Sequence, residues 1–149
     1  MIATRVGSMR TVVCVSPRLG IGQDMPCSPA DLSTLPCVNF EALSSASAWP
    51  FQLKDGKIST EVPIRARLSV NTAEAAVWAA SESIGATRVL HYQCADAVRA
   101  GLLRIVLADF EVEALPVHLL HAGRGALPSK MRVFLDFAAS RLRGRLGSL

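Results

Sequence analysis

The sequence predicts an α/β fold with a mostly parallel sheet, because short apolar runs of strand length alternate along it with segments of helical periodicity. The stretch 68–101 is the clearest example: a strand, a capped helix, a second strand and a second helix follow one another there. The 149 residues are 50% hydrophobic, which is enough for one packed core and short for two complete domains. We therefore expect helices packed on a single main sheet.

The first half of the chain is predicted to be mostly strands. An unbroken apolar run predicts a buried strand at 11–15, which Ser16-Pro17 ends. After a loop rich in Gly, Pro and Ser, a short strand is expected at 37–40. The Asp55-Gly56 pair then predicts a hairpin turn that leads into a half-exposed edge strand at 58–64.

The helix after the strand at 68–70 carries the strongest local signals. Asn71 and Glu74 have the spacing of an N-terminal capping box, and Gly85 is expected to end the helix. Its apolar positions repeat with helical period: Ala73, Ala76, Val77, Ala80 and Ile84.

The rest of the chain continues the alternation. Strands are expected at 87–90, 102–107 and 116–121, with a helix at 93–100 that Gly101 stops and a last helix at 128–143. The apolar stripe of the last helix predicts these buried residues: Met131, Phe134, Leu135, Ala138 and Leu142.

Composition excludes several classes of protein. No apolar run is long enough to cross a membrane, and no signal peptide is visible, so we expect a cytoplasmic protein without a membrane partner. The four cysteines form no CxxC pair, which argues against a zinc ribbon or a thioredoxin motif. His118 and His121 lie three apart in an expected strand and so point to opposite faces, which disfavours a shared metal ion. No cofactor motif is present.

Backbone geometry points to a ligand site at Asn71 and Thr72. A helix that starts at the end of a strand presents free N–H groups and short polar side chains, which suit a small anionic or polar ligand such as a carboxylate. The alternative is a plain helix cap, and both roles are compatible.

Several separate stretches resemble one family, the effector-binding part of LysR-type transcriptional regulators. Residues 5–17 resemble its crossing strand, and 127–137 (Leu-Pro-Ser-Lys-Met-Arg-Val-Phe-Leu-Asp-Phe) resemble its last helix. Leu90 departs from the proline usual in the family. Shorter matches lie in order between them: Trp49-Pro50-Phe51, Val70-Asn71-Thr72, Gly85-Ala86-Thr87 and Gly101-Leu102-Leu103.

The resemblance implies one lobe of a periplasmic-binding-protein-like fold with part of a second lobe. Residues 1–15 would be a crossing strand and remnant of the first lobe, 16–115 the second lobe, and 116–149 the return strand and last helix of the first. An effector would bind between the lobes, with two crossing strands as the hinge. The residues implied are Val70, Ala86 and Val117 as cleft walls, and Cys14, Val15 and Pro116 at the hinge.

The implied function is effector sensing without chemistry, and the effector itself is unidentified. The family's DNA-binding helix-turn-helix has no counterpart in these residues, so DNA contact is expected only through a part outside them.

Two other functions remain open. A dimerisation module without sensing is the first, since uncovered apolar surface would drive association into a dimer or larger. The second is a small enzyme that uses Cys94 or a histidine. The position of Cys94 at a helix start lowers a thiol pKa, and the same residue could sense redox state or be a small buried hydrophobe.

Overall fold

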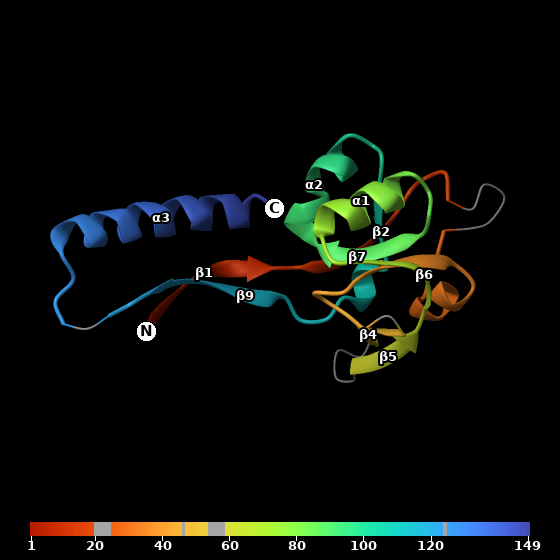
Figure 1. The fold of residues 1–149 in the computed structure, drawn as a ribbon, viewed down its shortest axis with the longest axis horizontal. Coiled ribbons are helices and arrows are strands. Elements are labelled where there is room, and N and C mark those ends of the chain that lie inside the picture. Colours follow the sequence, from red (N-terminus) through yellow and green to blue (C-terminus); the bar gives the residue numbers. More distant parts are fainter. Residues whose placement is uncertain (20–24, 46, 54–58, 124) are drawn as a thin grey trace. The chain divides into compact units, whose positions relative to one another are not determined.

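The fold was analysed in a computed structural model that describes residues 1–19, 25–45, 47–53, 59–123 and 125–149. The chain forms two compact units: a larger one of Arg10–Glu113, and a smaller one of Met1–Met9 with Ala114–Leu149 (Figure 1). Residues 10–15, expected to belong with the first segment of the chain, are thus part of the larger unit.

The larger unit is built on a five-stranded sheet with the order β6-β3-β7-β2-β8. Its strands are β2 (Thr11–Val15), β3 (Pro36–Phe40), β6 (Arg65–Val70), β7 (Ala86–Leu90) and β8 (Arg104–Val106). β3 pairs in parallel with β6 and β7, and β2 runs antiparallel to β7 and β8. Four strands therefore share one direction and only β2 opposes them, so the sheet is mostly parallel as expected.

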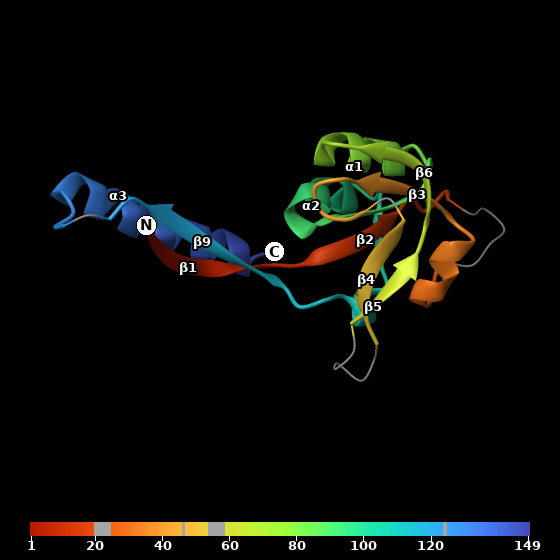
Figure 2. The ribbon, with the colours of Figure 1, turned by 60° about the horizontal axis from the view of Figure 1, so that its bottom comes forward.

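Both faces of this sheet are covered, and β2 shows how the two cores are divided. Val12 and Cys14 face α1 (Ala73–Ser81) and α2 (His91–Arg99), while Val13 and Val15 belong to the second core. That second core contains η1 (Pro29–Ser33) and the antiparallel hairpin of β4 (Ala48–Gln52) and β5 (Ser59–Pro63) (Figure 2). The predicted hairpin turn at Asp55-Gly56 lies outside the described residues.

The two helices of the larger unit end in different ways. α2 is stopped at Gly101, whose φ of +76° is the left-handed conformation that glycine adopts readily. α1 ends earlier than predicted, at Ser81, and Ser83 takes the left-handed φ of 63°. Gly85 has another reason to be glycine: a Cβ there would lie 2.6 Å from the carbonyl oxygen of Pro36 on β3.

The smaller unit is an antiparallel ribbon of β1 (Ile2–Met9) and β9 (Leu115–His121), with α3 (Ser129–Gly147) running along it (Figure 1). A separate strand at 2–9 was not predicted, because its apolar residues neither form a continuous run nor alternate regularly with polar ones. The close packing of β1 and α3 is visible at Gly7, where a Cβ would lie 2.8 Å from the side chain of Leu146.

The predicted buried stripe of α3 is only partly correct. Leu135, Ala138 and Leu142 are half-buried and Ala139 is buried, but Met131 is 41% and Phe134 60% exposed. The ribbon of two strands is too narrow to cover a wide helix face, so the helix turns its small residue Ala139 inward. No helix among the described residues is both long and apolar enough to cross a membrane.

Candidate functional site

The candidate site lies where the parallel strands β3, β6 and β7 end. The loops after β3 and β6 run side by side there, joined by a hydrogen bond from the N–H of Glu41 to the carbonyl of Val70 at 3.0 Å. From β3 the chain continues to β6 on one side of the sheet, whereas from β7 it continues to β8 on the other side. The connections therefore lead in opposite directions from the neighbouring strands β3 and β7. In open α/β sheets this switch point, at the carboxyl ends of the strands, is where ligands bind.

Thr72, rather than Asn71, caps α1. The hydroxyl oxygen of Thr72 accepts from the N–H of Ala75 at 3.3 Å, and its carbonyl accepts from the N–H of Ala76. The capping box predicted for Asn71 and Glu74 is therefore shifted by one residue. Asn71 is exposed next to the cap, and within the described chain neither side chain nor backbone accepts from the N–H groups of Ala73 and Glu74. Two helix donors thus remain available beside an exposed amide side chain.

The expected cleft walls lie in different places. Val70 is half-buried at the end of β6, next to Asn71. Ala86 is fully buried in the core shared with Trp49, because β7 is covered on both faces, and it presents no surface to a ligand. Val117 belongs to β9 in the smaller unit.

The expected hinge residues lie inside the two units. Cys14 and Val15 are buried in β2, between β7 and β8 in the sheet, and Pro116 lies in β9 opposite Ser8. Their hinge role stays a prediction.

Arg10 and Glu111 mark the places where the chain enters and leaves the larger unit. The guanidinium of Arg10 donates two hydrogen bonds to the Glu111 carboxylate, at 2.8 and 2.7 Å. These bonds raise the pKa of Arg10, against the opposing effect of its partial burial. The N–H of His91, the first residue of α2, also donates to the carbonyl of Arg10 at 2.9 Å. This entry point of the chain is therefore held by both side-chain and backbone bonds.

Arg88 was not predicted from the sequence as a site residue. It lies on β7 at the switch point, is 6% exposed, and donates one hydrogen bond to the hydroxyl of Ser44 at 2.6 Å. Ser44 belongs to the loop after β3, and its carbonyl accepts from the side-chain amide of Asn39 at 3.2 Å. A signal existed: Arg88 is a cation in the middle of a strand predicted to be buried.

Cys94 and Cys14 meet in the core between α2 and β2. The Cys94 thiol donates to the carbonyl of His91 at 3.4 Å. The interaction between the two thiols lowers the pKa of Cys94 and raises that of Cys14. Both side chains are 0% exposed, as expected for small hydrophobic core residues. All four cysteines are free thiols, with Cys27 exposed and Cys37 buried.

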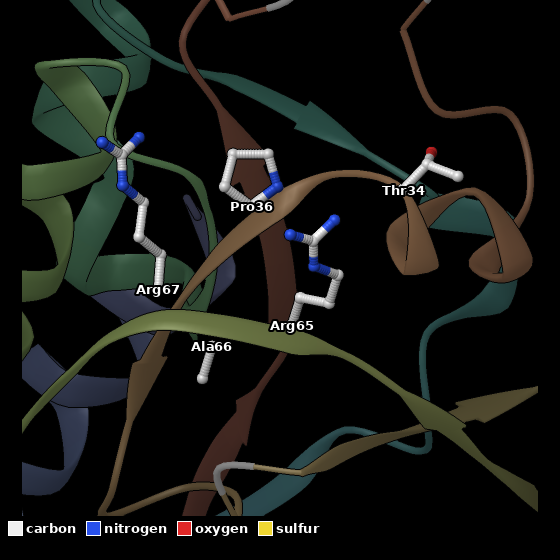
Figure 3. A pocket seen from close by; sticks show the side chains of 5 residues that line it. All are labelled: Thr34, Pro36, Arg65, Ala66 and Arg67. Atoms are coloured by element: carbon white, nitrogen blue, oxygen red, sulfur yellow. The ribbon is translucent and has the colours of Figure 1, made fainter.

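Two of the hollows among the described residues lie in the larger unit, away from this edge. One of about 450 Å³ lies at the beginning of β6, where Arg65 and Arg67 extend from one side of the strand and Ala66 from the other (Figure 3). The second, of about 520 Å³, lies between α1 and α2 and includes Trp78, which is 64% exposed. Among the described residues, no three His, Cys, Asp or Glu side chains are grouped to hold a metal ion.

Comparison with known proteins identifies the family. The family model of the LysR substrate binding domain matches residues 1–143. The chain belongs to this family. Its members are parts of transcription regulators and not enzymes, and the periplasmic-binding-protein-like α/β fold agrees with the sheet described above. No curated protein matches the sequence closely.

Solved structures of the LysR-type regulators agree in fold. The regulatory domain of AphB from Vibrio vulnificus is 22% identical with a TM-score of 0.78, over 94% of this chain and 68% of that one. CrgA from Neisseria meningitidis is 20% identical with a TM-score of 0.76, over 95% of this chain and 47% of that one. LysG from Corynebacterium glutamicum, solved with bound effector Arg, is 20% identical with a TM-score of 0.60, over 95% and 46%. The chain thus spans about half the length of the full-length regulators.

Proposed function

We propose that the larger unit senses a small-molecule effector for a LysR-type regulator, at the edge where β3, β6 and β7 end. The observation that carries this proposal is the convergence of Asn71, the free N–H groups of α1 and the Ser44 loop at the switch point of the sheet. These groups recognise polar ligands, and a carboxylate fits N–H donors at a helix start. The bound effector of LysG supports the proposal, since that protein has a similar fold.

Binding would act on the regulator by shifting its conformational population. An effector that binds one arrangement of the two units more tightly favours that arrangement by its difference in affinity. The two connections between the units, at Arg10 and Glu111, would be the places where the backbone changes. DNA would be contacted by another part of the regulator, in the cytoplasm.

A thermal-shift screen with small carboxylic acids and neutral metabolites tests the proposal. A true effector stabilises the folded protein by mass action, and Asn71→Ala should lose most of that stabilisation. Glu41→Ala, in the neighbouring loop, serves as the control and should keep it. If no compound raises the melting temperature of the wild-type protein, effector sensing by this chain is contradicted.

Self-association is the second candidate function, and it rests on a different observation. α3 exposes apolar side chains that lie close together along the helix: Val133 is 68%, Phe134 60% and Phe137 61% exposed. Exposed apolar clusters of this kind mark protein interfaces. Trp78 on α1, 64% exposed, is a further candidate contact.

Sedimentation at micromolar concentration separates the two functions. We expect a dimer or larger species for the wild-type chain, and a mass reduced to the monomer for the Phe134→Glu/Phe137→Glu variant. Leu102→Glu, which changes an exposed apolar residue of the other unit, is the control. A wild-type monomer would contradict association through α3.

A further inference from the structure

We propose that Arg88 binds the negative charge of an anionic ligand, together with the hydroxyl of Ser44. This inference rests on the proposed function, because it names the ligand class for the same edge of the sheet. It adds a charged side chain on β7, hydrogen-bonded to the loop after β3, to the N–H donors at the start of α1.

Arg88 carries a positive charge that no described ion pair balances. Arg88 is 6% exposed, and a guanidinium carries five N–H donors. One hydrogen bond, to Ser44, is made within the part of the chain that the structure describes. No described carboxylate lies within 4.0 Å of the Arg88 guanidinium. Burial lowers the pKa of Arg88, and the more distant Glu61 offsets this only in part.

Such an arrangement is costly for a structural arginine. No Arg88 nitrogen is among the described side-chain atoms that are fully buried without a partner, so the guanidinium is not shown to be sealed from a ligand. Burying most of a cation without a described counter-ion still weakens its hydration, and arginine does not escape by losing its proton. A carboxylate or another oxyanion would supply both the missing charge and acceptors for the fork of N–H donors. A bound anion would therefore compensate the charge of Arg88 that no described carboxylate balances.

The surroundings hold this site in place. The indole N–H of Trp49 donates to the side-chain oxygen of Asn39 at 3.1 Å, and Asn39 in turn holds the carbonyl of Ser44. Trp49 and Asn39 are both 0% exposed. The loop that presents the Ser44 hydroxyl is thus fixed by one buried and one partly buried hydrogen bond, as a preorganised binding site requires.

The position also separates Arg88 from the other arginines. Arg65 and Arg67 are exposed, lie at the opposite end of the strands and are free to be hydrated (Figure 3). Arg10 already has the Glu111 carboxylate as its partner. Arg88 combines burial, the switch-point position and the lack of a described counter-ion.

The test compares Arg88→Met with the wild-type chain, in sodium chloride and in sodium succinate, sodium benzoate or sodium phosphate at equal ionic strength. Methionine keeps the apolar stem and removes the charge. Without an added organic anion or phosphate, we expect the melting temperature of Arg88→Met to equal or exceed that of the wild type, because an uncompensated buried charge is gone. If Arg88 only stabilised the fold, Arg88→Met would melt at a lower temperature than the wild type.

The anion series gives the second readout. At least one of the three anions should raise the wild-type melting temperature by about 3 °C or more over chloride, and Arg88→Met should lose that rise. Arg65→Met carries the same change of net charge at an exposed position and should keep it. Should Arg88→Met fail to fold, Ser44→Ala and Arg88→Lys replace it, and each should reduce the rise without abolishing the fold.

Three results would overturn the proposal: a lower melting temperature of Arg88→Met in chloride, a rise in the anions that Arg88→Met retains, or no rise with any of them in the wild type. None of these results contradicts the proposed function. A neutral compound that stabilises the wild type but not Asn71→Ala would still support it. Conversely, loss of the rise in Arg88→Met alone supports Arg88 as the charge-binding residue.

Discussion

The two units of the chain differ in how fully their secondary structure is covered. In the larger unit the five-stranded sheet has a core on each face, and strands such as β2 are buried along their whole length. In the smaller unit a ribbon of two strands carries one helix, and α3 has only Ala139 as a buried residue. The difference lies in the number of layers that pack on each sheet. The larger unit has a core on both faces of its sheet, whereas the ribbon of the smaller unit carries a single helix.

This difference determines where a sequence pattern predicts burial correctly. In the larger unit an apolar residue meets a neighbour on either face of the sheet, so apolar runs translate into buried strands. In the smaller unit one side of α3 has no described neighbour, so Phe134 and Phe137 remain exposed despite their apolar character. Stability should accordingly be concentrated in the larger unit. Of the four predictions that follow, from the largest effect to the smallest, the first two compare the units and the last two refine the account of the larger one.

The largest effect is expected for Trp49→Ala compared with Phe137→Ala. Trp49 is 0% exposed and bonded to Asn39, so its loss should lower the free energy of unfolding by about 3–5 kcal/mol. Phe137 is 61% exposed beneath the guanidinium of Arg141, and its loss should cost less than about 1 kcal/mol. Urea denaturation followed by circular dichroism measures both. Equal losses of unfolding free energy in the two variants would contradict the difference in packing between the two units.

Alanine substitutions at two glycines should change the free energy of unfolding in opposite directions in the two units. Gly85→Ala in the larger unit should lower the free energy of unfolding by about 1–3 kcal/mol, because the new Cβ would lie 2.6 Å from the Pro36 carbonyl oxygen. Gly144→Ala in α3 meets nothing within 4 Å and should raise it by up to about 1 kcal/mol, because alanine favours the helix. The same denaturation experiment decides, and a stabilising Gly85→Ala would show that β3 and β7 can move apart.

High pH should destabilise the larger unit through Cys37. Burial raises the pKa of this thiol to about 11 from its ordinary value of 9.0. Between these pH values the unfolded chain loses the proton while the folded chain keeps it, so stability is full below pH 9 and falls as pH rises towards 11. The loss should reach up to about 2 kcal/mol.

The measurement is the urea midpoint at pH 7, 9 and 10.5, for the wild type and Cys37→Ala. The alanine variant should show a smaller fall, and Cys27→Ala, at an exposed thiol, serves as the control. A fall that is identical in Cys37→Ala would assign the effect to other groups.

The smallest effect is expected for Glu111→Gln. The Arg10–Glu111 pair is partly exposed, at 44% and 14% of the two side chains, so its loss should cost less than about 1 kcal/mol. Asp96→Asn, in the more exposed Arg99–Asp96 pair, should cost almost nothing. Both are read from the unfolding midpoint at low and high salt. A cost at Glu111 that does not shrink with salt would point to hydrogen-bond geometry instead of charge.

Most of the larger unit could be predicted from sequence because its signals are local. The apolar run at 11–15 and the left-handed stop at Gly101 need no knowledge of distant residues. The cap at Thr72 could not be separated from one at Asn71, since both have short polar side chains and only the path of β6 decides between them. The burial of Ala86 required knowing that β7 is covered on both faces.

Only those residues of the candidate site whose positions depend on local secondary structure were predicted. Asn71 and Thr72 could be found because a helix start follows a strand. Arg88 was missed because its partner Ser44 lies 44 residues away in the chain, and no spacing rule connects them. The exposed face of α3 was missed for the opposite reason: its pattern indicates burial, and the structure lacks a layer to provide it.

The reversed strand β2 has a consequence for how this protein is made. β2 is an early segment of the chain, but it lies in the sheet between β7 and β8, which follow it by more than 70 residues. During translation the segment 11–15 therefore leaves the ribosome long before its partners are synthesised. Its apolar side chains have no partner strands until β7 and β8 are synthesised. Folding of the sheet therefore has a high contact order and should be slow. We expect the nascent chain to depend on chaperones early in synthesis.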